Sequence, residues 1–94
     1  MKYNVYFPTP LEEIADIYDD NMDVCVEFNG RTYTFLIVTI KNLKSSAWLN
    51  PKGYVVPSDP FLIVEALKKD IIEDLLNELF KDVRLLEIYG SDIE

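Results

Sequence analysis

The sequence predicts a small single α+β domain, in which an antiparallel hairpin extends into a four- to five-stranded mixed sheet with two or three helices packed on it. Three observations lead to this fold class. Asn29-Gly30 separates two strand-forming runs, as the turn of a hairpin does. Apolar residues recur at helical spacing from Asp70 to Asp82. The 94 residues, 49% of them apolar, match the length and core content of one domain, residues 1–94.

The predicted hairpin is the most specific local signal. Asn-Gly is the preferred pair for a two-residue type I′ turn, and using it as the turn places Phe28 opposite Arg31. The same register pairs Val26 with Tyr33, Val24 with Phe35 and Met22 with Ile37. Side chains alternate between the two faces of a strand, so the apolar members of these pairs form the core face. The opposite face then holds Asp23, Cys25, Glu27, Thr32 and Thr34.

Further along the second strand of the hairpin, both faces become apolar. Leu36, Val38 and Ile40 alternate there with core residues. We expect this end of the strand to be covered on both sides, as a central strand is.

The segment before the hairpin predicts a short strand and a short helix. Residues 3–7 are typical of a strand that Pro8 stops. Thr9 and Pro10 are typical of a helix N-cap and a first helical position. Residues 10–19 are therefore predicted to form an amphipathic helix, with apolar positions at Leu11, Ile14, Ala15 and Tyr18.

Signals between the hairpin and the C-terminal third are shorter. Residues 43–49 predict one or two helical turns, and residues 50–53 are typical of a turn that leads into a short strand at 54–56. Residues 61–66 fit a buried strand or a helix, because periodicity does not separate the two in so short a run. We favour the strand because Asp70, with an acidic residue three positions later, is the better helix start.

The clearest helical pattern covers residues 70–82. Its apolar stripe consists of Ile71, Ile72, Leu75, Leu76, Leu79 and Phe80. Residues 83–89 alternate loosely and predict a last strand at a sheet edge. Together with residues 61–66, these segments predict a β–α–β unit with parallel strands.

The residue types that most often carry catalysis are missing. The chain has no histidine, which is the commonest general base and a usual zinc and haem ligand. Its single cysteine, Cys25, has no activating partner in the predicted hairpin, so we interpret it as a packing residue. Three glycines do not make a phosphate-binding loop. We therefore expect no catalytic residue, no cofactor and no metal.

One acidic segment has part of a calcium-loop pattern. Asp19, Asn21 and Asp23 have the spacing of the first three ligands in an EF-hand loop. The glycine that the loop requires falls on Val24, and its bidentate glutamate falls on Gly30. We interpret the segment as a turn before the hairpin.

Acidic and basic residues are sorted into blocks, and the formal net charge is −8. Residues 3–30 hold seven acidic residues and no basic one, whereas residues 31–58 hold four basic residues and no acidic one. A chain this acidic does not favour binding to nucleic acid or to anionic membranes. No apolar run approaches the ~20 residues of a membrane span, and the N-terminus has no signal-peptide core, so we expect a cytoplasmic protein.

Two groups of charged residues are candidate sites. The first is an acidic group that can speed association with a basic protein. Its members are Glu12, Glu13, Asp16, Asp19, Asp20 and Asp23. The second is a small basic patch with a stacking ring, suited to an anion; its members are Arg31, Lys41, Lys44, Trp48 and Lys52. Solubility and charge neutralisation within the molecule are the simpler explanations of both groups.

Size, charge and the missing residue types together predict a non-catalytic acidic protein-binding module of inhibitor, immunity or adaptor type, with a basic protein as partner. A small-molecule or anion-binding domain, or a carboxylate-based enzyme, is the alternative from a different class. A homo-oligomeric structural protein is a third hypothesis, because an edge strand at residues 83–89 would be open to pairing with a second copy.

Overall fold

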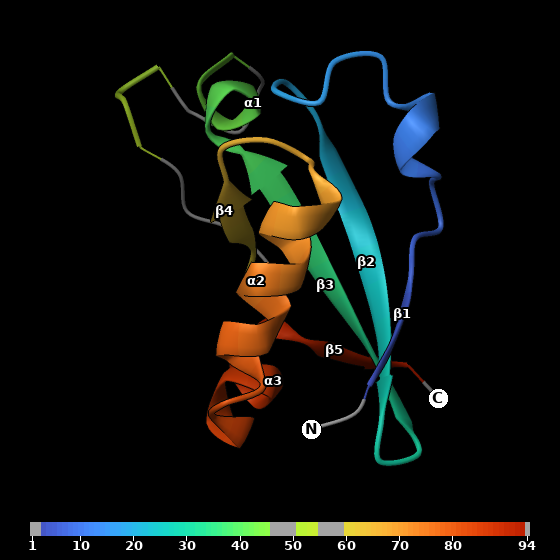
Figure 1. Cartoon of the computed structure of the whole chain (residues 1–94). Coiled ribbons are helices and arrows are strands. Elements are labelled where there is room, and N and C mark those ends of the chain that lie inside the picture. The colour runs from blue at the N-terminus through green and yellow to red at the C-terminus, as the bar shows by residue number, and fades with distance from the viewer. Residues whose placement is uncertain (1–2, 46–50, 55–59, 94) are drawn as a thin grey trace.

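The computed structural model describes residues 3–45, 51–54 and 60–93. It has a mixed sheet and three α-helices, which confirms the predicted small α+β fold. In chain order the elements are β1 (Asn4–Tyr6), the 3-10 turn η1 (Leu11–Glu13), β2 (Asn21–Phe28), β3 (Arg31–Thr39), α1 (Ile40–Ser45), β4 (Leu62–Val64), α2 (Lys69–Leu79), α3 (Val83–Tyr89) and β5 (Ser91–Ile93). Figure 1 shows α2 lying across one face of the sheet, with α1 at one end of the molecule and the β2–β3 turn at the other.

β2 and β3 form the predicted hairpin. Every predicted pair is present, beginning with Phe28 opposite Arg31 next to the turn. Asn29 and Gly30 have φ angles of 53° and 75°, and a type I′ turn requires positive φ at both positions. The turn residues and the hairpin register therefore agree.

β3 is the central strand of the sheet. It pairs antiparallel with β2 on one side. On its other side, the C-terminal end pairs parallel with β4 and the N-terminal end pairs antiparallel with β5. β1 pairs antiparallel with β2, which confirms the strand predicted at residues 3–7, and β4 confirms the strand predicted at residues 61–66.

The core lies between the sheet and the helices α2 and α3. The core face of the hairpin is buried as predicted, except that Phe28 is half-buried. α2 confirms the helix predicted for residues 70–82, and its Ile72 and Leu76 are fully buried against the sheet. Tyr3 stacks on Phe80 with 4.3 Å between ring centroids, so the start of β1 is packed against the end of α2.

The helix predicted for residues 10–19 is wrong. Only Leu11–Glu13 form a helical turn, and Ile14 already has an extended backbone with φ −78° and ψ 120°. Asp16 Oδ1 accepts a hydrogen bond from the Tyr18 N–H at 2.9 Å, and such local side-chain bonds compete with the helix ladder. Apolar side chains of the segment still pack partly against the core, so an extended path buries them in place of a helix.

The strand predicted for residues 83–89 is also wrong, because this segment forms α3. Asp82 is its N-cap and accepts a hydrogen bond from the Arg84 N–H at 3.0 Å. The helical conformation places Leu86 in the core. Where α3 ends, a Cβ on Gly90 would lie 2.8 Å from the Leu86 carbonyl oxygen, so only glycine fits this close approach before β5.

The predicted β–α–β unit of residues 61–66 and 83–89 is consequently wrong. The parallel pair in the sheet is β3 with β4, and the C-terminal strand is β5, which is antiparallel to β3.

The segment between β3 and β4 differs in part from the helical turns, turn and short strand predicted for residues 43–56. The helix expected at residues 43–49 begins earlier, at Ile40, and ends at Ser45, while residues 46–49 lie outside the described residues. The predicted turn includes Gly53 with φ 93°. Tyr54 is not in a strand, and the other two residues of the strand predicted at 54–56 lie outside the described residues.

The buried face of α2 gives a direct test of the core. We expect Ile72→Ala to lower the free energy of unfolding by about 2–5 kcal/mol, because Ile72 is fully buried and its truncation leaves a cavity. Ile88→Ala is the matched control, because Ile88 on α3 is 55% exposed. Urea unfolding of both variants measures the difference. Equal losses of stability would contradict the packing described here.

Candidate functional site

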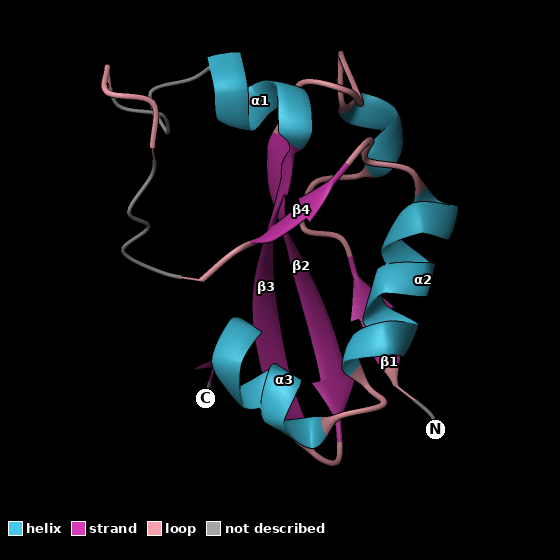
Figure 2. Ribbon diagram, turned by 90° about the vertical axis from the view of Figure 1, so that its left-hand side faces the viewer, coloured by secondary structure: helices cyan, strands magenta, loops and turns pink. Residues whose placement is uncertain are grey.

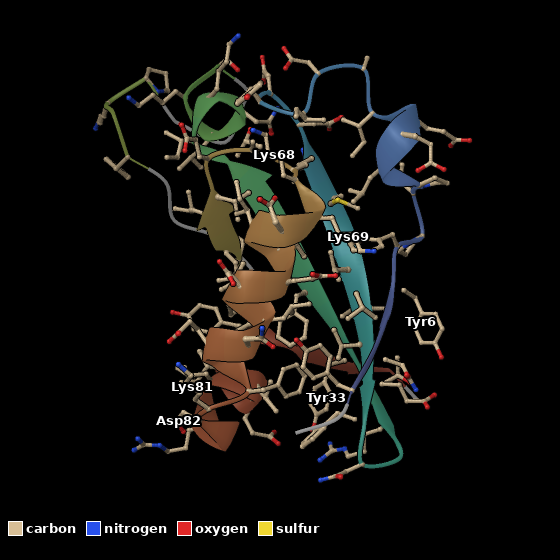
Figure 3. The ribbon with its side chains drawn as sticks, viewed as in Figure 1. Tyr6, Tyr33, Lys68, Lys69, Lys81 and Asp82 are labelled. Atoms are coloured by element: carbon tan, nitrogen blue, oxygen red, sulfur yellow. The ribbon has the colours of Figure 1, made fainter. Side chains whose placement is uncertain are left out.

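α2 packs on one face of the sheet, and α1 lies at one end of the opposite face, where Val38 is fully buried (Figure 2). We call this opposite face the second face and define it by Asn4, Tyr6, Asp23, Cys25, Glu27, Thr32, Thr34, Leu36, Val38 and Ile63. The strand β5 borders it next to Thr32 and Thr34. Figure 3 shows Tyr6 projecting from β1 away from the helices, and 51% of this residue is exposed. Tyr18 and Tyr54 are exposed to a similar extent, so exposure alone does not mark a site. Tyr6 is a candidate contact residue because it lies on the sheet face beside Cys25, with an apolar ring and a polar hydroxyl.

The strand register arranges the second face in rows that cross the sheet. Tyr6 lies opposite Cys25, and Cys25 lies opposite Thr34, so the three residues form one row over β1, β2 and β3. The Cys25 sulfur and the Thr34 hydroxyl are 3.7 Å apart. On β2, Asp23 and Glu27 flank this row, one on each side, and both are exposed.

The α1 end of the second face is covered only in part. Val38 is fully buried there, as expected for a central strand, and Leu36 is half-buried. Ile40, which was expected to continue the covered stripe, begins α1 and is 46% exposed. The expectation of cover on both sides therefore holds for Val38 but not for Ile40.

The structure divides the predicted acidic group into three parts. Glu12, Glu13 and Asp16 are exposed on η1 and on the loop that follows it. Asp23 lies on the second face, together with Glu27, which the sequence had placed on that face but not in the acidic group. The remaining two members, Asp19 and Asp20, are half-buried and belong to a hydrogen-bond network.

That network joins the loop before β2 to the start of α1. The buried Thr39 hydroxyl accepts hydrogen bonds from the N–H groups of Asp20 and Asn42, both at 3.2 Å. The Thr39 N–H donates to the Asp20 carbonyl at 3.1 Å. Asp19 Oδ1 accepts from Asn42 Nδ2 at 3.1 Å and from Ser45 Oγ at 3.2 Å. Asp19 and Asp20 therefore hold the fold together at this end of the molecule.

Four acidic residues of the helical layer are paired with basic ones, whereas Asp70 and Asp74 of α2 form no ion pair with a described residue. Ion pairs join Arg31 to Glu87, Lys69 to Glu73, Lys81 to Glu78 and Arg84 to Asp82. By contrast, Glu12, Glu13, Asp16, Asp23 and Glu27 form no ion pair with any residue that the structure describes. The uncompensated negative charge thus includes the η1 region and the second face.

The structure does not bring the predicted basic patch together. Lys41 and Lys44 are exposed on α1, at one end of the molecule. Arg31 lies next to the hairpin turn, at the other end, 5.5 Å from the centre of the Tyr33 ring. Lys52 lies in the turn at 51–53, and Trp48 falls outside the described residues.

Two features of the described residues bear on metal binding and on membrane insertion. These residues contain no cluster of three or more His, Cys, Asp or Glu side chains placed to hold a metal ion. Within the same ranges, no helix is long and apolar enough to cross a bilayer.

Ionisable groups with shifted pKa values lie at the α2–α3 end of the molecule. Burial raises the pKa of the Tyr3 phenol, and the nearby Glu73 carboxylate raises it further. The Tyr3 hydroxyl donates to Asn77 Oδ1 at 2.6 Å. Hydrogen bonds from Arg84 lower the pKa of the Asp82 carboxyl below its ordinary 3.8. The Tyr3 contact joins the start of β1 to α2, the Asp82 contacts lie at the start of α3, and both sets of contacts lie outside the second face.

Comparison of the chain with protein-family models, with curated proteins and with solved structures found no match. Function therefore has to be inferred from the residues of this chain.

Sequence reasoning missed the second face as a candidate site. The hairpin register had already placed Asp23, Cys25 and Glu27 on one side, which was the available signal. The position of Tyr6 beside Cys25 depends on the pairing of β1 with β2, and one sequence does not show that register.

The Thr39 network gives a second prediction. We expect Thr39→Val to lower the free energy of unfolding by about 1–3 kcal/mol, because it leaves the N–H groups of Asp20 and Asn42 without their acceptor while keeping the side-chain shape. Thr32→Val is the control, since the half-buried Thr32 makes no side-chain hydrogen bond with a described residue. Chemical denaturation of both variants is the measurement, and an equal effect would exclude the network as a stabilising contact.

The Asp82–Arg84 pair gives a prediction on pH dependence. Because the pKa of Asp82 is lowered in the folded state, its contribution to stability is complete above about pH 4 and is lost as pH falls through the folded pKa. Asp82→Asn keeps a good N-cap but removes the charge. We expect its melting temperature to lie below that of the wild type at neutral pH, and the difference to vanish in acid.

Thermal unfolding monitored by circular dichroism between about pH 2 and pH 7 covers this range. Arg84→Gln should reduce the same pH-dependent difference, since it takes away the side-chain hydrogen bonds that lower the pKa of Asp82 most and leaves the hydrogen bond from the backbone N–H of residue 84. A difference that stayed constant down to the lowest pH would show that the charge of Asp82 is not responsible.

Proposed function

We propose that this chain is a non-catalytic acidic binding module that covers a basic surface of a protein partner. The observation that carries this proposal is that acidic residues in different parts of the molecule differ in ion pairing. In the α2–α3 layer four acidic residues are in ion pairs and two, Asp70 and Asp74, are not. By contrast, Glu12, Glu13, Asp23 and Glu27 are all exposed, and none of them forms an ion pair with a described residue.

These exposed acids are not required by the fold. The core is apolar, and the only buried polar residue among those described is Thr39, whose hydroxyl is satisfied. Negative charge that does not serve folding remains available to attract a partner of opposite charge, and a net charge of −8 extends this attraction beyond direct contact. A basic protein fits this charge, whereas a nucleic acid backbone would be repelled.

The alternative of an anion-binding or enzymatic domain has less support. Arg31 lies at the opposite end of the molecule from Lys41 and Lys44, so these three residues do not form one site. An inhibitor, immunity or adaptor role needs only a folded scaffold with an exposed acidic surface, which this domain has.

The proposal is tested by capture from the lysate of the host with tagged protein, at low salt and again near 0.5 M salt, where the screening length is several-fold shorter. We expect one stoichiometric basic protein, retained more weakly at high salt. With that partner purified, we expect the double variant Glu12→Lys/Glu13→Lys to associate about tenfold more slowly, because charges outside the contact mainly affect the association rate.

The control is the double variant Glu65→Lys/Asp74→Lys, which changes the net charge equally. Both of these residues are exposed and form no ion pair with a described residue, and Asp74 lies on α2. Stopped-flow association rates compare the two variants. Equal rates would show that only net charge matters, and the absence of any captured basic protein would refute the proposed function.

A further inference from the structure

The second face has a chemical pattern that neither the core nor the hydrogen-bond network explains. Its central row, Tyr6, Cys25 and Thr34, is uncharged and has an exposed aromatic ring at one end. Asp23 and Glu27 flank this row on β2. Residues four apart on a strand are separated by about 13 Å, so two negative charges border an uncharged strip at a defined spacing.

No basic residue lies among the residues that define the second face. A second copy of this chain that docked through its own second face would bring two acidic faces together with no base to compensate them, which costs free energy when like charges meet across an interface. Charge complementarity therefore favours an occupant with basic side chains over self-association.

The shape of the face favours an extended segment as that occupant. Sheets pack on sheets through alternating side chains, and a strand that lies on the face can place residues of one side toward β2. On such a segment, two basic residues about four positions apart would reach Asp23 and Glu27. An apolar residue midway between them would then cover the central row beside Tyr6, and a tyrosine in that position is typical of residues that dominate binding energy.

We propose that the second face is the docking surface for an extended basic segment of the protein partner, with a lysine or arginine at each of Asp23 and Glu27 and an apolar side chain over the row of Tyr6, Cys25 and Thr34. This assignment rests on the proposed function and adds the contact surface and the partner's residue pattern. The exposed acids of η1 lie outside this surface and would act on the approach of the partner.

The test uses the full chain as bait for a displayed library of random peptides about twelve residues long. We expect the selected peptides to contain two basic residues about four positions apart with an apolar residue between them. The dissociation constants of synthetic copies are then measured by fluorescence anisotropy. We expect the variant Asp23→Lys/Glu27→Lys, and separately Tyr6→Ala, to weaken binding at least about tenfold.

Two controls match these changes. Glu65→Lys/Asp74→Lys alters the net charge equally, and Tyr54→Ala removes a tyrosine that is 51% exposed, as Tyr6 is. Both controls should bind within about twofold of the wild type, the variation usual for residues outside the contact. Melting temperatures show that each variant is folded.

Cys25 gives a readout that an electrostatic effect elsewhere would not change. It is the only cysteine of the chain, it lies in the central row, and it is partly exposed. We expect a saturating peptide to slow its alkylation by neutral iodoacetamide several-fold, because the bound segment covers the thiol. The reaction is followed by mass spectrometry of the intact protein.

Each remaining outcome overturns the docking surface. In one outcome, peptides bind without slowing the alkylation of Cys25, and their affinity depends on Glu12 and Glu13 but not on the acids of the second face. This result would place the contact at η1 and would leave the proposed function unchanged. A library that yields no basic peptide would remove the docking surface, while capture from lysate decides the proposed function separately.

Discussion

The two-residue turn at Asn29-Gly30 determines which side chains face the core and which face solvent. Both residues have positive φ, and the turn aligns Phe28 with Arg31 and every later pair of the hairpin. A shift of one residue would exchange the two faces of β2 and β3. The buried packing against α2 and the pattern of the second face therefore depend on the same local constraint. β1, β4 and β5 are short strands, and each pairs with one of these two long ones.

At the other end of the hairpin, a polar network has a comparable role. Thr39 ends β3 and is the single buried polar residue among those described, and its hydroxyl and N–H hold both the loop before β2 and the start of α1. Two acidic residues that the sequence assigned to a binding surface, Asp19 and Asp20, take part in this network. Exposure and hydrogen bonding thus separate acids with a structural role from acids that remain available to a partner.

The acidic residues of η1 and those of the second face have different positions, and we propose that they act at different stages of binding. The η1 acids are exposed outside the sheet face and contribute to the long-range field, which affects the rate of encounter. Asp23 and Glu27 border an uncharged row on the second face, where we propose that a partner makes contact. A small domain can carry such a surface because its core is complete on one face of the sheet, between the hairpin and the helices.

The sequence by itself determined the hairpin with its register, a helix over most of residues 70–82, the short strand within residues 3–7 and the acidic character, because each depends on local turn chemistry, periodicity or composition. The strand within residues 61–66 was favoured only by the helix start that follows it, since so short an apolar run fits a helix as well. Residues 10–19 and 83–89 could not be assigned in this way. Their apolar spacing fits more than one conformation, and the outcome depended on Asp16 and Asp82, whose side chains bond to nearby backbone. Only the tertiary structure placed Tyr6 beside Cys25 and packed α2 on the other face of the sheet, because strand pairing and helix position are set by contacts between residues distant in sequence.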